Sequence, residues 1–419
     1  MQVLIVGAGI GGLTLALCLL RQGLKVTIYE RSHTLEEVGA GIQIGPNGSK
    51  VLAALGLLHE LEQVAFKPQA AEMRMGDATG RIIFSLPLGS QCEQRYHAPY
   101  FNIHRADLQR ILVGAVQHQA PNVIQLGYEL KDLAQNEQGV ELFFTNGESA
   151  KGKILIGADG VRSAVRKLLF NIEDGQFTGM AAWRMTVPSS RLPKNFVPPK
   201  ATVWVGKGQH AVTYYVRGGQ LVNLVGIVEQ DHWPYDDWTC QGNKQDIVAA
   251  YANWHPIIKG ILEAGDDTEY YQWALRDLPP LTEWFKGRVC LLGDACHAML
   301  PFMAQGAVMA IEDAWVLAQK IAEFPSNPPQ AFNHYEKERK PRASKVQATS
   351  RRNGQLYHQH SSAGQMLFYS PLWLASRLTP NFFASQLDLA ICRGCNHLGL
   401  TRLSLILARC VSLELSPNF

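Results

Sequence analysis

Three short apolar runs of strand character lie far apart in the chain, and a glycine-rich turn directly follows each one. The runs are Val3–Val6, Ile154–Ile156 and Val289–Leu292. Unbroken apolar runs of this length are typical of central parallel strands that are covered on both faces. An open α/β sheet binds phosphates at glycine-rich turns after such strands. Three of these turns predict one nucleotide ligand that is long enough to span them all.

The first turn, from Gly7 to Gly12, has the spacing GxGxxG. In this motif Gly7 permits the tight turn, Gly9 lets the backbone approach a pyrophosphate, and Gly12 lets the next helix pack close to the strand. We expect that helix over Leu13–Arg21, with Gly23 as its stop. The free N–H groups at the start of the helix would stabilise phosphate charge.

A second strand is predicted over Lys25–Tyr29, and Glu30 stands at its end. An acidic residue about 20 positions after the glycines holds the hydroxyl pair of a ribose in dinucleotide-binding proteins. Because this position carries Glu30 and not an arginine, it fits an unphosphorylated ribose. The ligand is therefore expected to be FAD or NAD and not NADP, and Arg31 is a further candidate for binding it.

The second turn, Gly157 to Gly160, contains Asp159 and is followed by Arg162 and Arg166. The two arginines are four residues apart, so we expect them on one helix face beside the turn, where they would bind an anion. The alternative is a solvated helix face.

The third turn begins at Gly293 and continues to Ala307. Asp294 is expected to end a strand, where its carboxylate would accept hydrogen bonds from a polyol. Pro301 makes the backbone rigid, and Gly306 and Ala307 open a helix whose free N–H groups would face an anionic part of the ligand. A structural helix start explains Gly306 equally well, but not the whole set of polar and rigid residues in the segment, which comprises Asp294, His297, Pro301 and Gln305.

Composition narrows the classes of function. Apolar residues make up 47% and charged residues 18% of the chain, as in ordinary globular proteins, and a net charge of +3 gives no support for nucleic-acid binding. The eight cysteines show no secreted-type framework, which favours reduced thiols and a cytoplasmic location. No segment is apolar enough to predict a membrane span. Cys392, Cys395 and His397 look like half a zinc site without its second pair, so no metal is predicted.

In this order the motifs closely resemble those of the single-component, class A flavoprotein monooxygenases, the aromatic hydroxylases of the salicylate and para-hydroxybenzoate hydroxylase type. In that family the GxGxxG motif and the acid bind the ADP half of FAD. The central Asp-Gly motif serves both FAD and the nicotinamide donor, the Gly-Asp motif binds the ribitol, and the segment after it lines the isoalloxazine. The matching positions here are Gly7, Gly9, Gly12 and Glu30, then Asp159 and Gly160, then Gly293 and Asp294, then Pro301 through Gly306 and Ala307.

Two further segments extend the resemblance, which covers about residues 1–355. His104–Leu108 is similar to the family's HRxxL segment, whose arginine, here Arg105, lies along the FAD pyrophosphate and ribitol. Gly39–Asn47 is similar to the loop by which the salicylate-type members approach the flavin, and Gln43 in it is a candidate substrate contact. The resemblance implies FAD as the bound cofactor. Because no second GxGxxG motif is present, NADH or NADPH is expected to bind only transiently as electron donor.

The predicted fold class is α/β: a Rossmann-like FAD-binding domain, an inserted, mostly antiparallel β-sheet substrate domain over the flavin, and C-terminal helices. One helix is expected over Gln245–Ala264, and a basic helical stretch with a solvated face over Pro328–Tyr357, interrupted by Pro341. Leu398–Leu415 could form an amphipathic helix of unassigned function. The expected limits are 1–70, 101–175 and 276–325 for the FAD-binding domain, 71–100 and 176–275 for the substrate domain, 326–391 for the C-terminal helices and 392–419 for an atypical tail.

The resemblance implies an NAD(P)H-driven monooxygenase that hydroxylates a small aromatic substrate through a C4a-hydroperoxyflavin, with molecular oxygen as co-substrate. Such chemistry needs a group that favours phenolate, usually His or Tyr. His297 is one candidate, with a hydrogen-bonded structural histidine as the alternative. Tyr214 and Tyr215 are others, and strand alternation sends them to opposite faces, so only one can face the flavin. Pro301, in the segment that lines the isoalloxazine in the resembling family, is the remaining candidate for a catalytic role.

Trp183 and Arg184 are candidates for holding an aromatic carboxylate through stacking and a bidentate pair, against the alternative of a core Trp and a surface Arg. We therefore expect a phenolic or N-heteroaromatic substrate that carries a carboxylate. Three other functions stay open: an FAD-dependent epoxidase or polycyclic natural-product hydroxylase, an FAD oxidoreductase that uses no oxygen, and a flavin-binding protein with impaired catalysis. A monomer or homodimer is expected.

Overall fold

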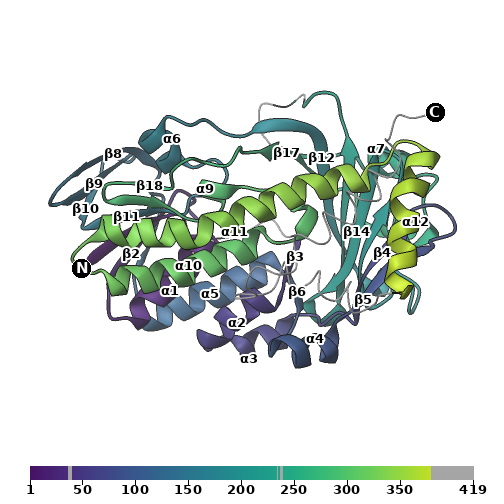
Figure 1. Cartoon of the computed structure of the whole chain (residues 1–419), viewed down its shortest axis with the longest axis horizontal. Coiled ribbons are helices and arrows are strands. Elements are labelled where there is room, and N and C mark those ends of the chain that lie inside the picture. The colour runs from purple at the N-terminus through teal and green to yellow at the C-terminus, as the bar shows by residue number, and fades with distance from the viewer. Residues whose placement is uncertain (36–39, 234, 236–238, 379–419) are drawn as a thin grey trace, which may run out of the picture.

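The computed structural model describes residues 1–35, 40–233, 235 and 239–378 of the 419-residue chain. The predicted tail of 392–419, with Cys392, Cys395, His397 and the helix of Leu398–Leu415, lies outside the described residues. The start of the loop at Gly39 does too. The chain forms two layered regions side by side, one around a parallel sheet and one around a larger, mostly antiparallel sheet (Figure 1).

The first region is built on a six-stranded sheet in the order β18–β19–β11–β1–β2–β7. All neighbouring strands are parallel except β18 and β19, so the three apolar runs of the sequence lie side by side in its centre. The carboxyl ends of β1, β11 and β19 therefore meet at one edge. The strands are β1 (Gln2–Val6), β2 (Lys25–Glu30), β7 (Ile124–Leu126), β11 (Ile154–Gly157), β18 (Phe285–Lys286) and β19 (Val289–Leu291).

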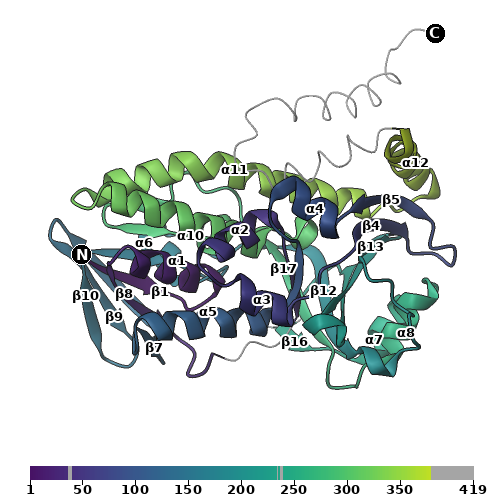
Figure 2. The ribbon, with the colours of Figure 1, turned by 90° about the horizontal axis from the view of Figure 1, so that it is seen from below.

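Two different layers cover this sheet. Helix α1 (Ile10–Arg21) packs against α5 (Arg105–Gln119) and α10 (Gly306–Glu323) on one side (Figure 2). On the other side lies the three-stranded sheet of β8 (Leu130–Asn136), β9 (Gly139–Phe144) and β10 (Ser149–Gly152), where Leu4 of β1 contacts Gly152. Both faces of the central strands are therefore buried, which explains their lack of polar residues. The short helices α2 (Pro46–Ala54), α3 (Leu58–Val64) and α6 (Ala164–Phe170) complete this region.

The second region is an eight-stranded sheet in the order β16–β17–β12–β15–β14–β13–β4–β5. Its neighbours are antiparallel except β13 and β4, and its strands come from residues 70–87 and 176–277. The strands are β4 (Ala70–Met75), β5 (Ile82–Pro87), β12 (Gln176–Pro188), β13 (Ala201–Val205), β14 (Gln209–Val216), β15 (Leu221–Glu229), β16 (Thr239–Gln241) and β17 (Tyr271–Asp277). A small pair, β3 (Gly41–Ile44) and β6 (Phe101–His104), joins the regions, and α4 (Gly89–Tyr96) follows β5.

The helix predicted over Gln245–Ala264 is wrong, because the structure has two helices there, α7 (Lys244–Ala250) and α8 (Pro256–Ala264). Proline disfavours helical geometry in the residue before it but suits the first turn of a helix. Pro256 accordingly starts α8, and the His255 ring caps it by accepting a hydrogen bond from the Ile257 N–H at 3.3 Å. Both helices cover the face of the eight-stranded sheet that is turned away from the parallel sheet (Figure 2).

The predicted interruption at Pro341 is also wrong, since α11 (Pro328–Tyr357) runs through it as one helix of 30 residues. Its basic residues do not all form a solvated face. Arg339 is buried and Arg342 and Arg351 are partly buried, and all three pair with carboxylates of other elements. These ion pairs hold both halves of α11 against the protein and offset the hydrogen bond that Pro341 cannot donate.

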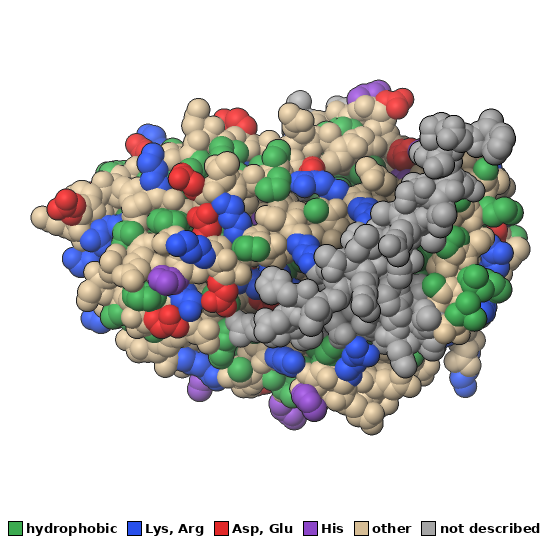
Figure 3. Space-filling view, viewed as in Figure 1, with side chains coloured by type: hydrophobic (Ala, Val, Ile, Leu, Met, Phe, Trp, Pro, Cys, Tyr) green, Lys and Arg blue, Asp and Glu red, His purple; other side chains and the backbone are tan. Residues whose placement is uncertain are grey.

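Helix α12 (Ser362–Leu378) packs on β5 at the end of the described chain (Figure 1). Among the described residues no helix is long and apolar enough to cross a membrane. On the face shown in Figure 3, acidic and basic side chains are interspersed and do not gather into a patch of one sign.

Candidate active site

The turn after β1 has the geometry that its glycines predict. Gly7 has φ of +106°, and a Cβ atom there would meet the Ala158 carbonyl oxygen at 2.4 Å. A Cβ atom at Gly12 would lie 2.1 Å from the Gly7 carbonyl oxygen, so only glycine allows α1 to pack this close. A Cβ atom at Gly9 would meet no atom within 4 Å. Gly9 therefore borders open space, as expected where a ligand approaches the backbone.

The first and second turns share one cavity of about 200 Å³. Glu30 lies at its edge, where its carboxylate accepts hydrogen bonds from the N–H of Ala8 at 2.8 Å and of Ser32 at 3.0 Å. The cavity therefore brings Gly7, Gly9 and Glu30, which were predicted for the ADP half of the cofactor, beside Asp159 and Gly160 of the second turn. Its lining includes Gly7, Gly9, Glu30, Arg31, Asp159, Gly160 and Arg162, together with Tyr29 and Tyr128.

Asp159 fixes the second turn through the start of α6. Its carboxylate accepts hydrogen bonds from Ser163 Oγ at 2.6 Å and from the Val165 N–H at 3.0 Å. The prediction that Arg162 and Arg166 share a helix face is wrong, because α6 begins after Arg162. Arg162 lines the cavity, whereas the fully buried Arg166 donates to the Ala295 carbonyl oxygen at 3.1 Å. Arg166 thus ties the second turn to the third.

The third turn places Asp294 opposite the start of α10. Strand β19 ends before Gly293, which has φ of +63°, and Asp294 begins the short helix α9 (Asp294–His297), so it does not end a strand as predicted. Asp294 is exposed to solvent, as expected of a side chain that lines a cleft. The protein atoms around its carboxyl group displace water from it and so raise its pKa. A Cβ atom at Gly306 would lie 3.8 Å from Asp294 Oδ1. Pro301 is exposed in the turn Pro301–Met303 between them, and Ala307 is half-buried.

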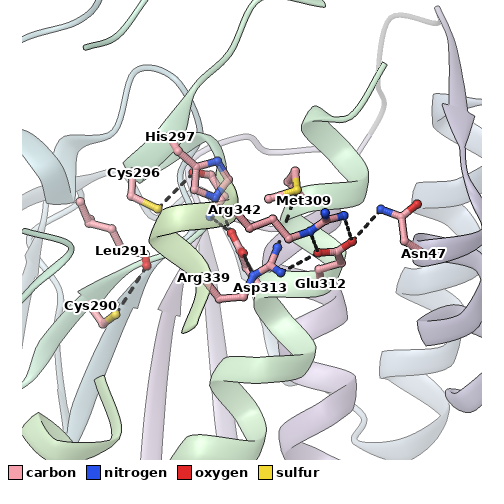
Figure 4. A network of polar contacts seen from close by, with 11 residues as sticks. Asn47, Cys290, Leu291, Cys296, His297, Met309, Glu312, Asp313, Arg339 and Arg342 are labelled. Atoms are coloured by element: carbon pink, nitrogen blue, oxygen red, sulfur yellow. Dashed lines mark hydrogen bonds and ion pairs between the residues drawn. The ribbon is translucent and has the colours of Figure 1, made fainter. Parts of the chain in front are cut away.

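The structure does not support a catalytic role for His297. The side chain is only 1% exposed, and its Nε2 atom bonds the buried carboxylate of Asp313 in α10 (Figure 4). Burial alone would lower the pKa of His297, but Asp313 raises it above its usual value. The alternative of a hydrogen-bonded structural histidine fits this placement, because the ring turns into the protein and not into the cleft.

His297 belongs to a buried ion-pair network that sequence reasoning missed (Figure 4). Arg339 of α11 lies 2.6 Å from both Asp313 and Glu312, and Arg342 lies 2.8 Å from Glu312. Asn47 donates to Glu312 at 2.6 Å, which links the network to the segment after β3. Burial alone would raise the pKa of Glu312, but the two arginines lower it to about 2. The network locks α10 and α11 behind the third turn.

Strand alternation decides which candidates of the eight-stranded sheet face the cleft. Trp183 and Tyr215 lie on the outer face, where Trp183 is buried beside Gly242 and the Tyr215 hydroxyl donates to the Val197 carbonyl oxygen at 2.9 Å. Trp183 is therefore wrong as a substrate contact, because it packs under α7 and α8. Arg184 and Tyr214 lie on the opposite, inner face, toward β3 and Arg105.

Arg184 and Tyr214 come together on this inner face. The Arg184 guanidinium lies 4.8 Å from the centre of the Trp273 ring, and burial and the nearby Arg105 lower its pKa to about 10. The Tyr214 ring lies against Gly41, and burial raises its pKa. Gln43, on the same small strand pair, donates to Asn102 at 3.3 Å.

Three other residues near Tyr214 or Arg184 were not predicted from the sequence: Asn223, Tyr100 and Trp273. Asn223 accepts a hydrogen bond from the Gly41 N–H at 2.7 Å. A polar side chain inside the apolar run of β15 was the available signal for it, because it marks a position that a hydrophobic core would not select. Tyr100 precedes β6, and no sequence pattern points to it.

These residues fit an extended dinucleotide cofactor. Gly9 and Gly160 present open space at the shared cavity, Glu30 and Asp294 supply carboxylates for hydroxyl groups, and α10 begins at Gly306, close to Asp294, as suits a ligand with an anionic part. The fold and these residues are those of an FAD-dependent oxidoreductase that carries a second, eight-stranded sheet beside its nucleotide-binding region.

The chain belongs to a known family. Residues 1–350 match the family model described as FAD binding domain. The chain is 34% identical over 377 residues to 3-amino-4-hydroxybenzoate 2-monooxygenase PtnB3 of Streptomyces platensis, covering 90% of this chain and 93% of the relative. It is 35% identical to 6-hydroxynicotinate 3-monooxygenase of Pseudomonas fluorescens, covering 84% and 91% of the two chains. The protein is thus a class A, FAD-dependent aromatic monooxygenase, for which NADH or NADPH is the typical donor.

Solved structures agree with this assignment. The fold is similar to that of Klebsiella pneumoniae HpxO complexed with FAD and uric acid, with a TM-score of 0.82, 25% identity and coverage of 94% of this chain and 98% of that one. It is also similar to a salicylate hydroxylase substrate complex, with a TM-score of 0.76, 25% identity and coverage of 94% and 99%. The fold class and the FAD cofactor predicted from the sequence are confirmed.

Proposed function

We propose that the protein hydroxylates a small phenolic or N-heteroaromatic ring that carries a carboxylate. The relatives named above act on 3-amino-4-hydroxybenzoate and 6-hydroxynicotinate, and another, from Polaromonas naphthalenivorans, is a 3-hydroxybenzoate 6-hydroxylase. All three names describe hydroxylated aromatic carboxylates. When bound, the flavin supplies the transfer of electrons and the activation of O₂, and the protein orients the ring and excludes water.

The observation that carries the proposal is the Arg184 cation on the inner face, a partly buried side chain whose Nε atom is buried. Among the described residues no carboxylate pairs with Arg184, and its Nε atom has no hydrogen-bond partner. A buried charge without a partner is costly, so such a site favours a ligand that brings the opposite charge. An aromatic carboxylate would pair with the guanidinium while its ring lies beside Tyr214 and Trp273.

Tyr214 is the residue that we propose to act on the hydroxyl group of the ring. It lies on the same face as Arg184, whereas Tyr215 lies partly buried on the opposite face and His297 is buried in the interior. We assign Glu30, Arg31, Asp159, Gly160 and Arg105 to the cofactor, with Asp294, Gly306 and Ala307 at the ribitol and the ring. Gln43 is proposed to contact the substrate. We further propose a monomer or homodimer in the cytoplasm, and the free thiols of the described cysteines support that location.

The test compares Arg184→Gln with wild type on pairs of ligands that differ only in the carboxylate, such as 3-hydroxybenzoate and phenol. Loss of a buried, charge-assisted contact is expected to raise the dissociation constant of the carboxylated member by about 30-fold or more and to leave that of phenol nearly unchanged. Arg191→Gln, which removes a half-exposed arginine of the same sheet domain, is the matched control. Equal losses for both ligands would contradict the proposed role of Arg184.

A further inference from the structure

Helix α12 carries an apolar surface that the described part of the protein leaves open to solvent. Eleven large hydrophobic side chains are exposed among the described residues, and six of them lie within the 17 residues of this one helix. Scattered exposed apolar residues are normal, but a concentration of them on one element indicates a surface that another segment or molecule covers. The six are Met366, Leu367, Phe368, Trp373, Leu374 and Leu378.

One side of α12 is already packed on the eight-stranded sheet (Figure 2). Tyr369 is 1% exposed and belongs to the same apolar cluster as Met73 of β4 and Ile83 of β5. Near the end of the helix, Ser376 Oγ donates a hydrogen bond to the Ile83 carbonyl oxygen at 3.3 Å. These contacts fix the orientation of α12, so its outer side cannot turn inward to bury the exposed residues.

Three leucines form a stripe along the outer side of α12. Leu374 and Leu378 follow Leu367 by seven and eleven residues, a spacing that places all three on one face of a helix, and they are 50%, 71% and 57% exposed. At about 3.6 residues per turn, this face lies opposite Tyr369 and Ser376. We call these residues the leucine stripe. A helix that is apolar on both sides is normally buried between two neighbours, and among the described residues the leucine stripe has none.

The charge pattern of α12 does not suit a membrane surface. Arg377 is its only charged residue, and the guanidinium lies 4.0 Å from the centre of the Trp373 ring. Helices that lie on membranes carry many lysines and arginines on a polar face opposite the apolar one. The face of α12 opposite the leucine stripe is instead packed on protein. The leucine stripe therefore fits an apolar protein segment better than a lipid.

A segment later in the same chain has a matching pattern. Residues 398–415 lie outside the described residues, and their sequence predicts an amphipathic helix. Its apolar side would contain a second stripe that extends over eleven residues, or about 16 Å, the same length as the leucine stripe. Arg402 and Arg409 would fall on the other side, toward solvent. The members of this second stripe are Leu400, Leu403, Leu407 and Val411.

We propose that the leucine stripe of α12 is the docking surface for residues 398–415 of the same chain. Nineteen residues separate Leu378 from Leu398. Fully extended they would span about 60 Å, so the segment can fold back along α12 without strain. A tethered segment binds at an effective concentration in the millimolar range, which favours it over a second copy of the protein. Docking would bury apolar side chains of both helices, and it does not depend on the proposed function.

The test measures backbone hydrogen exchange of residues 398–415 by mass spectrometry in the FAD-loaded full chain. We expect exchange at least about tenfold slower than in a synthetic peptide of the same sequence, because docked helical N–H groups are protected. Leu374→Gln should raise the exchange rate of the segment about tenfold and leave exchange in α11 unchanged, since Leu374 is half-exposed. Leu168→Gln, which alters a leucine of α6 that is 42% exposed, is the matched control and should have no effect. Wild-type exchange as fast as in the free peptide would overturn the proposal.

A change in the segment itself provides an independent check. Leu407→Gln should release residues 398–415 as Leu374→Gln does. The double variant should exchange little faster than either single variant, because each substitution already abolishes the same contact. A segment that stays protected in Leu374→Gln packs elsewhere in the protein, and that result would also overturn the proposal.

Two other partners of the leucine stripe would give different results. If a second copy covers it, light scattering will show that Leu374→Gln changes a dimer into a monomer, while exchange in residues 398–415 is the same in both proteins. If a lipid surface covers it, wild type but not Leu374→Gln will sediment with phosphatidylcholine–phosphatidylglycerol vesicles, again with unchanged exchange. Either result would rule out docking of the segment. All of these measurements are made without an aromatic substrate, so they stand whether or not the protein hydroxylates one.

Discussion

Replacing Glu312 by glutamine should remove the central anion of the network behind the third turn. Glu312 is 1% exposed and pairs with Arg339 at 2.6 Å and Arg342 at 2.8 Å. Its pKa falls from an ordinary 4.5 to about 2 in the folded protein. At about 1.4 kcal/mol for each pH unit, the charge contributes about 3 kcal/mol to folding near neutral pH. Glutamine keeps the size of the side chain and the hydrogen bond from Asn47. It leaves the buried Arg339 and the partly buried Arg342 with less negative charge beside them.

The pH dependence provides a second check on the same variant. Because the folded-state pKa lies below the ordinary one, the contribution is complete above pH 4.5 and is lost as the pH falls toward 2. The advantage of wild type over Glu312→Gln should therefore shrink from about 3 kcal/mol at neutral pH to about 2 kcal/mol one pH unit below the ordinary pKa.

The assay is equilibrium unfolding in urea, followed by tryptophan fluorescence of the FAD-free protein at both pH values. Glu323→Gln is the matched control, because Glu323 lies in the same helix, is half-exposed and pairs with Lys320. Its loss should cost about 0.5 kcal/mol or less. If Glu312→Gln is no less stable than this control near neutral pH, the buried network does not carry the stability assigned to it.

Two further predictions compare neighbouring residues. Gly12→Ala should lower both folding stability and FAD content, since its Cβ atom would lie 2.1 Å from a carbonyl oxygen. Gly9→Ala should show normal stability in urea titrations but lose FAD affinity, measured by flavin fluorescence. Equal FAD affinity in Gly9→Ala and wild type would contradict the pyrophosphate contact. Tyr214→Phe should lower kcat about tenfold or more with little change in the free energy of unfolding. Tyr215→Phe should keep the wild-type kcat and lose about 1 kcal/mol of the free energy of unfolding in urea. The reverse result would show that Tyr215, and not Tyr214, acts on the substrate.

The sequence predicted the strand–turn–helix geometry around Gly7 and Gly12 because local rules govern it. Gly7 has the positive φ that the turn after β1 needs, a Cβ atom at Gly12 would meet the Gly7 carbonyl oxygen, and Glu30 follows at the end of the next strand, so a short stretch of chain contains the whole pattern. The alternation of Tyr214 and Tyr215 was likewise predictable from the strand period alone. Which of the two faces the cleft depends on how the whole sheet packs, and no local pattern contains that information.

The failures arose where long-range contacts override local preference. Trp183 and His297 look like binding residues by type and position, but tertiary packing turns both into interiors. In the sequence Arg339 is one of many cations on a basic helix. Its two buried carboxylate partners, Glu312 and Asp313, lie in a different helix, α10. Asn223 pairs with Gly41, which is 182 positions away in the chain, so its role becomes visible only in the folded protein.

The most direct test of the proposed function is hydroxylation of an aromatic carboxylate under isotopically labelled O₂. The FAD-loaded protein is given NADH or NADPH and 3-hydroxybenzoate, 6-hydroxynicotinate or 3-amino-4-hydroxybenzoate, and the products are analysed by mass spectrometry. We expect at least one of these rings to gain a single hydroxyl group that carries the label. Reduction of the flavin without any labelled aromatic product across these substrates would contradict it.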